Sequence, residues 1–115
     1  MTAQTSIDAG PLYSTLGSDP DLGGMVDLFL DEMPERVANF LNLLGQQDWK
    51  ELGRAAHQLK GAAGSYGFKQ ISPCAARLED AVEDGLPIEQ IRQGVEELTD
   101  LCRRAAARPA DCDLP

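Results

Sequence analysis

His57 is the only histidine of this 115-residue chain, and Lys60 follows it by three residues. A neutral imidazole offers an unprotonated ring nitrogen near pH 7, so a histidine can act as a nucleophile without a separate base. On a helix, a lysine three residues further on lies one turn away, where its ammonium can stabilise charge on a group in transfer. This pair predicts nucleophilic phosphoryl chemistry at His57, with Lys60 in a supporting role.

Three glycines accompany the pair, at Gly53, Gly61 and Gly64. At about 100° per residue, His57 lies about 140° around a helix from Leu52, which is near the centre of the apolar stripe. The glycines fall on the same outer side as His57. Each glycine inside a helix costs about 1 kcal/mol relative to alanine. We expect that easier access of a partner protein to the helix surface offsets that cost, because a surface without side chains lets the partner's backbone come close.

The rest of the sequence does not complete an enzyme active site. It has no second histidine for a metal pair, no Gly-Lys-Ser/Thr phosphate loop and no recognisable serine or cysteine nucleophile. Cys74, Cys102 and Cys112 lack metal-ligand spacing, and we interpret the first two as core residues. The chain is therefore predicted not to be an enzyme and to need no cofactor or metal of its own. Mg²⁺ is expected on carboxylates of the partner.

The elements that must position His57 are predicted from apolar spacing to be helices. Asp19 and Pro20 form an N-cap and first-turn pair, and apolar residues at spacings of three and four follow. They predict one long helix over residues 20–44, which Gly45 ends. Pro34 removes a backbone hydrogen bond in its middle, so this helix should be kinked or divided there.

Capping residues and glycines delimit three more helices. Asp48 with Glu51 makes a capping box for the helix that carries His57, and Gly67 closes it. A third helix is predicted from Ser72 and Pro73 to Gly85, and a fourth starts at Pro87. Four amphipathic helices with short connections can bury their apolar stripes together only as a bundle.

The predicted organisation is a single domain. Residues 1–18 are expected to form a flexible segment or a short helix, residues 19–107 the helical bundle, and residues 108–115 a disordered tail. Aromatic residues make up only 5% of the chain against 43% hydrophobic residues, which suits packed helices better than a sheet. There is no apolar run long enough to span a bilayer and no leader-like N-terminus, so we expect a cytoplasmic monomer that does not contact a membrane.

The net charge of −9 argues against a nucleic-acid partner, because phosphate binding needs a basic surface. The charge is unevenly distributed, however. Residues 49–77 carry five basic side chains and a single acidic one, which leaves a large negative excess on the rest of the chain. This basic segment around His57 is expected to attract an acidic partner to one face of the molecule.

Residues 55–68 read AAHQLKGAAGSYGF, which resembles the H-x-L-K-G-x-x-x-x-x-G signature of histidine phosphotransfer (HPt) domains. His57, Leu59, Lys60, Gly61 and Gly67 match it position for position, and the resemblance extends from about residue 20 to residue 106. It implies an antiparallel four-helix bundle in which His57 is phosphorylated and exchanges the phosphoryl group with an aspartate of receiver domains.

The resemblance also implies roles for neighbouring residues. Lys60 would support the transfer, Gly61 and Gly64 would allow receiver docking, and Gly67 would shape a turn. Gln58, Arg54 and Gly53 are further docking candidates. The partners would be response-regulator receivers or a hybrid histidine kinase.

Two alternatives to a phosphorelay carrier stay open from the sequence. One is a helical module that binds a receiver or another partner without being phosphorylated. The other is the substrate domain of a larger sensor kinase, although the initiating methionine and the polar C-terminal segment favour a short separate protein.

Overall fold

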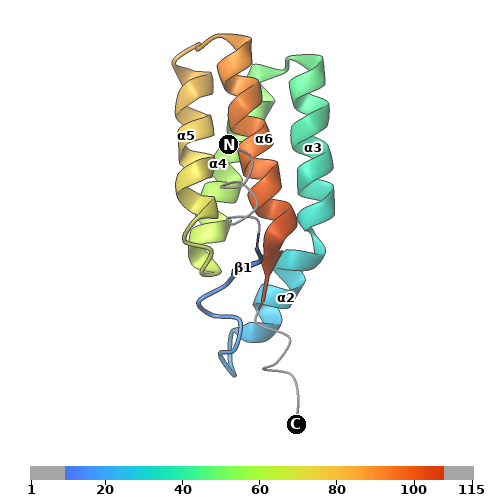
Figure 1. The fold of residues 1–115 in the computed structure, drawn as a ribbon, viewed down its shortest axis with the longest axis vertical. Coiled ribbons are helices and arrows are strands. Elements are labelled where there is room, and N and C mark those ends of the chain that lie inside the picture. Colours follow the sequence, from blue (N-terminus) through green and yellow to red (C-terminus); the bar gives the residue numbers. More distant parts are fainter. Residues whose placement is uncertain (1–9, 108–115) are drawn as a thin grey trace.

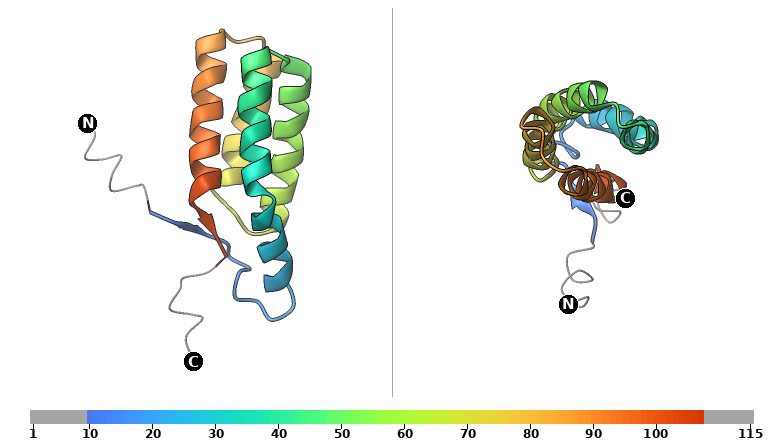
Figure 2. Two further views of the ribbon diagram at one scale, coloured as in Figure 1. Left: turned by 90° about the vertical axis from the view of Figure 1, so that its right-hand side faces the viewer. Right: turned by 90° about the horizontal axis from the view of Figure 1, so that it is seen from above.

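The computed structural model describes residues 10–107, and Figure 1 shows helices standing side by side along the long axis of the molecule. The elements are, in chain order, β1 (Leu12–Tyr13), α2 (Gly23–Asp31), α3 (Met33–Gln46), α4 (Trp49–Ser65), α5 (Ile71–Glu83), α6 (Ile88–Arg104) and β2 (Ala105–Ala106). Short connections join α3, α4, α5 and α6, so consecutive helices run antiparallel. The predicted antiparallel four-helix bundle is confirmed, and α2 precedes it as an additional short helix (Figure 2).

The core is mainly aliphatic, as the composition predicts. Every helix from α2 to α6 contributes buried side chains spaced three or four residues apart. Three aromatic residues close one end of it. The ring of Phe29 on α2 lies 5.0 Å from that of Tyr66 and 5.7 Å from that of Phe68, measured between centroids. These contacts fix α2 against the C-terminal end of α4.

The predicted long helix is divided into α2 and α3 at Glu32, and Pro34 lies in the first turn of α3. The division predicted from this proline is therefore confirmed. The predicted start was too early. The Asp19 carboxylate accepts hydrogen bonds from the N–H groups two and three residues later, at 2.7 and 2.9 Å, but these close a turn, and α2 begins only at Gly23.

The predicted end of the same helix was also wrong by two residues. Gly45 lies inside α3, and the chain reverses at Gln47, whose φ of 56° places it in the left-handed region. Asp48 follows directly and caps α4, because its Oδ1 accepts a hydrogen bond from the N–H of Glu51 at 3.3 Å. One short connection thus ends α3 and starts α4.

The boundaries that glycines and prolines predicted for the other helices are confirmed. Gly67 and Gly85 adopt positive φ values of 82° and 66° just beyond α4 and α5, as helix-terminating glycines do. α5 begins at Ile71, so Pro73 lies in its first turn, and Pro87 is the N-cap of α6.

Of the segment 1–18, residues 10–18 form a short strand and turns and not the short helix that was one of the two expectations; residues 1–9 and 108–115 lie outside the described part of the chain. β1 pairs in parallel with β2 and crosses the end of the bundle. The buried hydroxyl of Ser14 donates to the carbonyl of Tyr66, and the N–H of Thr15 donates to the carbonyl of Gly67 at 2.9 Å. We call residues 12–17 the N-terminal strap. The sequence did not reveal it because a two-residue strand has no measurable apolar periodicity.

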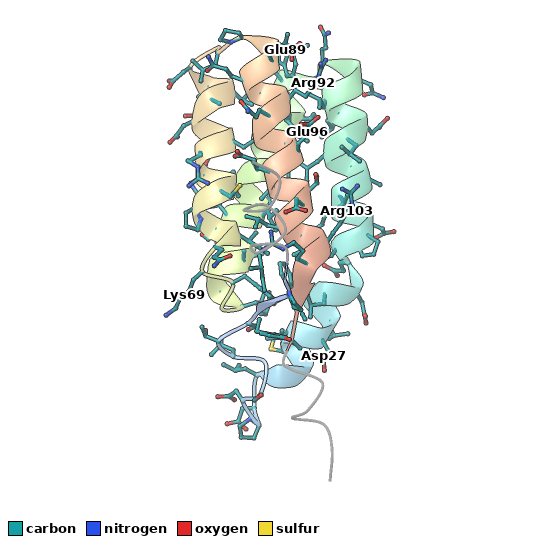
Figure 3. The ribbon with its side chains drawn as sticks, viewed as in Figure 1. Asp27, Lys69, Glu89, Arg92, Glu96 and Arg103 are labelled. Carbon is teal, nitrogen blue, oxygen red and sulfur yellow. The ribbon has the colours of Figure 1, made fainter. Side chains whose placement is uncertain are left out.

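The outer faces of the helices are strongly charged. Glu89, Arg92 and Glu96 all project from the exposed side of α6 (Figure 3). Among residues 10–107, no helix is both long enough and apolar enough to cross a membrane.

The strap makes Gly67 a position where a side chain has no room. A Cβ at this residue would lie 2.5 Å from Thr15 Oγ1 and 2.9 Å from the backbone nitrogen of Thr15, and the positive φ adds strain. We expect Gly67→Ala to lower the free energy of unfolding by about 2–4 kcal/mol. Gly85→Ala is the matched control, because Gly85 has a similar φ and no atom within 4 Å of a Cβ; it should cost only about 1 kcal/mol. Equal losses in urea or thermal melts would show that the strap does not hold Gly67.

Candidate functional site

The register of α4 places His57 on the surface. Leu52, Ala56 and Leu59 are fully buried on the inner side of the helix, so His57 and Gln58, the two residues between Ala56 and Leu59, point outward. The His57 side chain is 64% exposed. Its accessibility therefore follows from the apolar stripe that anchors α4 in the bundle, as the sequence predicts.

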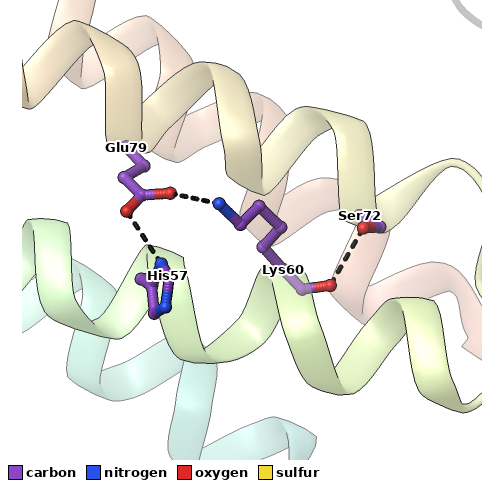
Figure 4. A network of polar contacts seen from close by, with 4 residues as sticks. All are labelled: His57, Lys60, Ser72 and Glu79. Atoms are coloured by element: carbon purple, nitrogen blue, oxygen red, sulfur yellow. Dashed lines mark hydrogen bonds and ion pairs between the residues drawn. The ribbon is translucent and has the colours of Figure 1, made fainter.

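Glu79 is the residue that the sequence analysis missed. It lies on α5, which packs antiparallel against α4, and its side chain points back toward His57 and Lys60 (Figure 4). One carboxylate oxygen, Oε2, lies 2.9 Å from His57 Nδ1, and the other, Oε1, accepts a hydrogen bond from Lys60 Nζ at 2.8 Å. A single carboxylate thus binds both residues that were singled out for their chemistry.

The charges in this cluster reinforce one another. The hydrogen bond from Lys60 is the main reason why the pKa of Glu79 is lowered, and the bond from His57 adds to it. The same bond with Glu79 raises the pKa of Lys60. A lowered folded-state pKa means that Glu79 contributes to stability above the ordinary carboxyl pKa, and that this contribution is lost as the pH falls through the folded value.

The ionised Glu79 decides the tautomer of His57. A carboxylate can only accept a hydrogen bond, so Nδ1 of the imidazole must carry the proton. In a neutral ring the other nitrogen, Nε2, then has a free lone pair. The exposed imidazole is therefore oriented with Nδ1 toward α5, and Nε2 is the nitrogen that keeps a free lone pair.

The antiparallel hairpin of α4 and α5 explains why local sequence reasoning did not find Glu79. It lies 22 residues after His57, outside the motif. The sequence did contain a signal for this contact. His57 and Glu79 are separated from the turn at Gly67 by similar numbers of residues, and Glu79 directly follows the buried Leu78. Pairing the two predicted helices about their turn would have brought these side chains together.

Lys60 also belongs to a second α4–α5 contact. Its backbone carbonyl accepts a hydrogen bond from Ser72 Oγ at 2.9 Å, near the start of α5 (Figure 4). This is an additional hydrogen bond between the helices, at a residue one helical turn after His57. It fixes the relative register of α4 and α5 beside His57.

The glycines around His57 are not equivalent. A Cβ at Gly61 would meet nothing within 4 Å, so this position is open. A Cβ at Gly64 would lie 3.5 Å from Ser72 Oγ, and one at Gly53 would lie 3.4 Å from Val82 Cγ1. None of the three has a positive φ. Gly53 and Gly64 therefore border α5, whereas Gly61 faces open space.

The remaining docking candidates lie beside the histidine. Gln58 and Arg54 are both exposed on α4. Arg54 Nε lies 4.0 Å from a carboxylate oxygen of Glu51, which is the limit of an ion pair and leaves the guanidinium largely free to bind elsewhere.

The expected basic face does not form as a uniform patch. The basic segment ends at Arg77, and α5 then brings acidic residues alongside α4. The negative charges of Glu79, Asp80 and Glu83 all raise the pKa of Lys60. The surface around His57 is therefore mixed in charge, with Lys50 and Arg54 on the α4 side and acidic residues on the α5 side.

The described residues include no other obvious reactive centre. No group of three or more His, Cys, Asp or Glu side chains within residues 10–107 could hold a metal ion. Cys74 and Cys102 are buried free thiols, and burial raises the pKa of Cys102 to about 12, so it is protonated at neutral pH. Cys112 lies outside the described residues.

The tautomer of His57 provides a direct check of this geometry. In ¹⁵N NMR spectra of the neutral imidazole, we expect the Nδ1–H form to predominate in the parent protein. Glu79→Ala should abolish that preference, because the acceptor that holds the proton on Nδ1 is lost. Lys60→Ala is the matched control, since it leaves Glu79 in place and should keep the Nδ1–H form. A parent protein with the Nε2–H tautomer would contradict the cluster.

Comparison with known proteins agrees with the fold and the motif. The family model described as the Hpt domain matches residues 24–108, which is most of the chain and includes α3 to α6 with His57 and Lys60. No curated protein and no solved structure matches the chain significantly. A helical bundle that exposes its single histidine within this match leads to one assignment: the chain belongs to the Hpt domain family, whose members serve histidine phosphotransfer in two-component phosphorelays.

Proposed function

We propose that this protein is a phosphorelay intermediate, in which His57 accepts a phosphoryl group from the aspartate of one receiver domain and donates it to another. The observation that carries the proposal is the hydrogen bond between Glu79 and His57 Nδ1, which leaves Nε2 as the free nucleophile. The family assignment supports it independently. We further propose that the protein acts as a monomer in the cytoplasm, with receivers or a hybrid histidine kinase as partners.

The transfer needs few groups from this chain. The lone pair of Nε2 attacks the phosphorus of the aspartyl phosphate, the N–P bond forms, and the P–O bond to the aspartate breaks. The bonding electrons leave with the aspartate as a carboxylate. The imidazole ring gains positive charge as the N–P bond forms, and the negative Glu79 next to Nδ1 stabilises that charge. The reverse sequence of bonds returns the group to a second receiver.

Lys60 has a different part in this scheme. Its ammonium is held by Glu79 at 2.8 Å, with 37% of its side chain exposed. Once the phosphoryl oxygens arrive beside the histidine, the flexible lysine can turn toward them while Glu79 stays bound to Nδ1. Magnesium held by carboxylates of the receiver is expected to supply the remaining charge stabilisation.

The first test is phosphorylation itself. Incubation with a phosphorylated receiver should add one acid-labile, base-stable phosphoryl group to the chain, detected by intact mass. His57→Gln should remove it completely, because no other histidine is present. Phosphorylation that persists in this variant would refute the assignment. A parent chain that binds receivers yet stays unmodified would favour a non-phosphorylated docking module.

Loss of Lys60 should slow the transfer without unfolding the bundle. We expect Lys60→Ala to reduce the transfer rate by about 10-fold to 100-fold, which is less than the loss of a well-placed transition-state donor, because the partner's metal carries most of the charge. Stopped-flow or rapid-quench rates at low salt measure this effect. A rate equal to that of the parent would leave Lys60 only the role of holding Glu79.

The two glycines beyond His57 should respond differently to substitution. Gly64→Ala should raise the free energy of unfolding by up to about 1 kcal/mol, since its Cβ would make ordinary contact with Ser72 and alanine favours the helix. Transfer should barely change. Gly61→Gln should also leave the chain folded, yet slow transfer substantially, because its side chain would stand in the open space that a receiver must enter. Thermal melts and transfer rates separate these outcomes, and normal transfer by Gly61→Gln would exclude close docking there.

A further inference from the structure

A groove of about 450 Å³ begins at His57 and runs between α4 and α5 toward the N-terminal end of α4. Trp49 lines it together with Gly53, and Val82 lines it from α5. Gly53 allows the close approach of the two helices here, because even a Cβ would be 3.4 Å from Val82 Cγ1. The groove lies on the opposite side of His57 from Gly61 and Gly64, so the transfer chemistry described above does not use it.

The charged residues of the groove are divided between its two walls. Lys50 and Arg54 line the α4 wall. Within residues 10–107, Lys50 has no ion-pair partner and Arg54 has only its 4.0 Å contact with Glu51. The α5 wall carries two carboxylates, Glu79, which is ion-paired with Lys60, and Glu83. A bound carboxylate would therefore be attracted to the α4 wall and repelled from the α5 wall.

A receiver whose interface is centred on His57 also covers this groove. Trp49 is eight residues before His57, or about 12 Å along the helix axis. A protein interface of standard size buries about 800 Å² on each partner, a patch that extends roughly 15 Å from its centre. With His57 at the centre, the whole groove falls inside that patch.

We infer that the groove is a specificity site for the receiver, which inserts an apolar side chain between Trp49 and Val82 and places a neighbouring carboxylate against Lys50 and Arg54. The inference rests on the proposed function for the identity of the partner. Residues on the N-terminal side of His57 would then select the receiver, whereas His57, Lys60 and Glu79 carry out the phosphoryl transfer. Buried apolar anchors with a charged rim are the usual source of both affinity and partner choice.

The single tryptophan makes the groove directly observable. The full-length ¹⁵N-labelled chain, carrying His57→Gln so that no transfer occurs, is titrated with an unphosphorylated receiver. The indole N–H resonance of Trp49 should shift as the complex forms. Binding that leaves this resonance unmoved would overturn the inference, whether or not the parent chain accepts a phosphoryl group. Failure of every receiver to bind would overturn both this inference and the proposed function.

Two matched pairs of variants test the apolar and charged parts separately. Gly53→Gln fills the groove and should weaken receiver binding by about 10-fold or more, whereas Gly45→Gln, at an open glycine in α3, should bind as the parent does. Arg54→Glu should weaken binding by about 5-fold to 10-fold, and less at high salt, whereas Arg92→Glu on α6 should have no effect. Since Arg54 is exposed, its variant tests the site even if Gly53→Gln proves unstable. Parent-like binding by both groove variants would overturn the inference.

Discussion

The functional geometry of this protein depends on one carboxylate that bridges two helices. Glu79 reaches from α5 to α4 and accepts hydrogen bonds from His57 Nδ1 and Lys60 Nζ. Without it, the exposed imidazole would be free to rotate and to carry its proton on either nitrogen. With it, the ring has a defined orientation, a defined tautomer and a negative charge beside Nδ1, on the side away from Nε2.

That bridge requires an accurate register between α4 and α5, which the packing supplies. Fully buried Leu52, Ala56 and Leu59 fix the rotation of α4, and Leu78, next to Glu79, anchors α5 in the same core. The hydrogen bond from Ser72 Oγ to the Lys60 carbonyl adds a second polar contact between the two helices. The reactive side chain can therefore be exposed to a partner and still be held precisely, because its supports come from elements buried beneath it.

The sequence predicted the parts of the fold that depend on local interactions. The apolar spacing of α4 and the Asp48 cap were sufficient to place His57 on an outer face, and Pro34 correctly divided the first long helix. Features that depend on contacts between distant segments were not predicted. Glu79 becomes part of the site only when α5 folds back on α4, and Gly67 is covered by a strap more than 50 residues earlier in the chain.

In the proposed mechanism, Glu79 makes Nε2 of His57 the phosphorylated atom. The most direct test is heteronuclear NMR of the phosphorylated protein with ¹⁵N-labelled histidine, in which scalar coupling identifies the nitrogen bonded to phosphorus. We expect coupling of ³¹P to Nε2 together with a protonated Nδ1 that remains hydrogen-bonded to Glu79. Coupling of ³¹P to Nδ1 would contradict it, because the nitrogen that Glu79 holds would then be the one that carries the phosphoryl group.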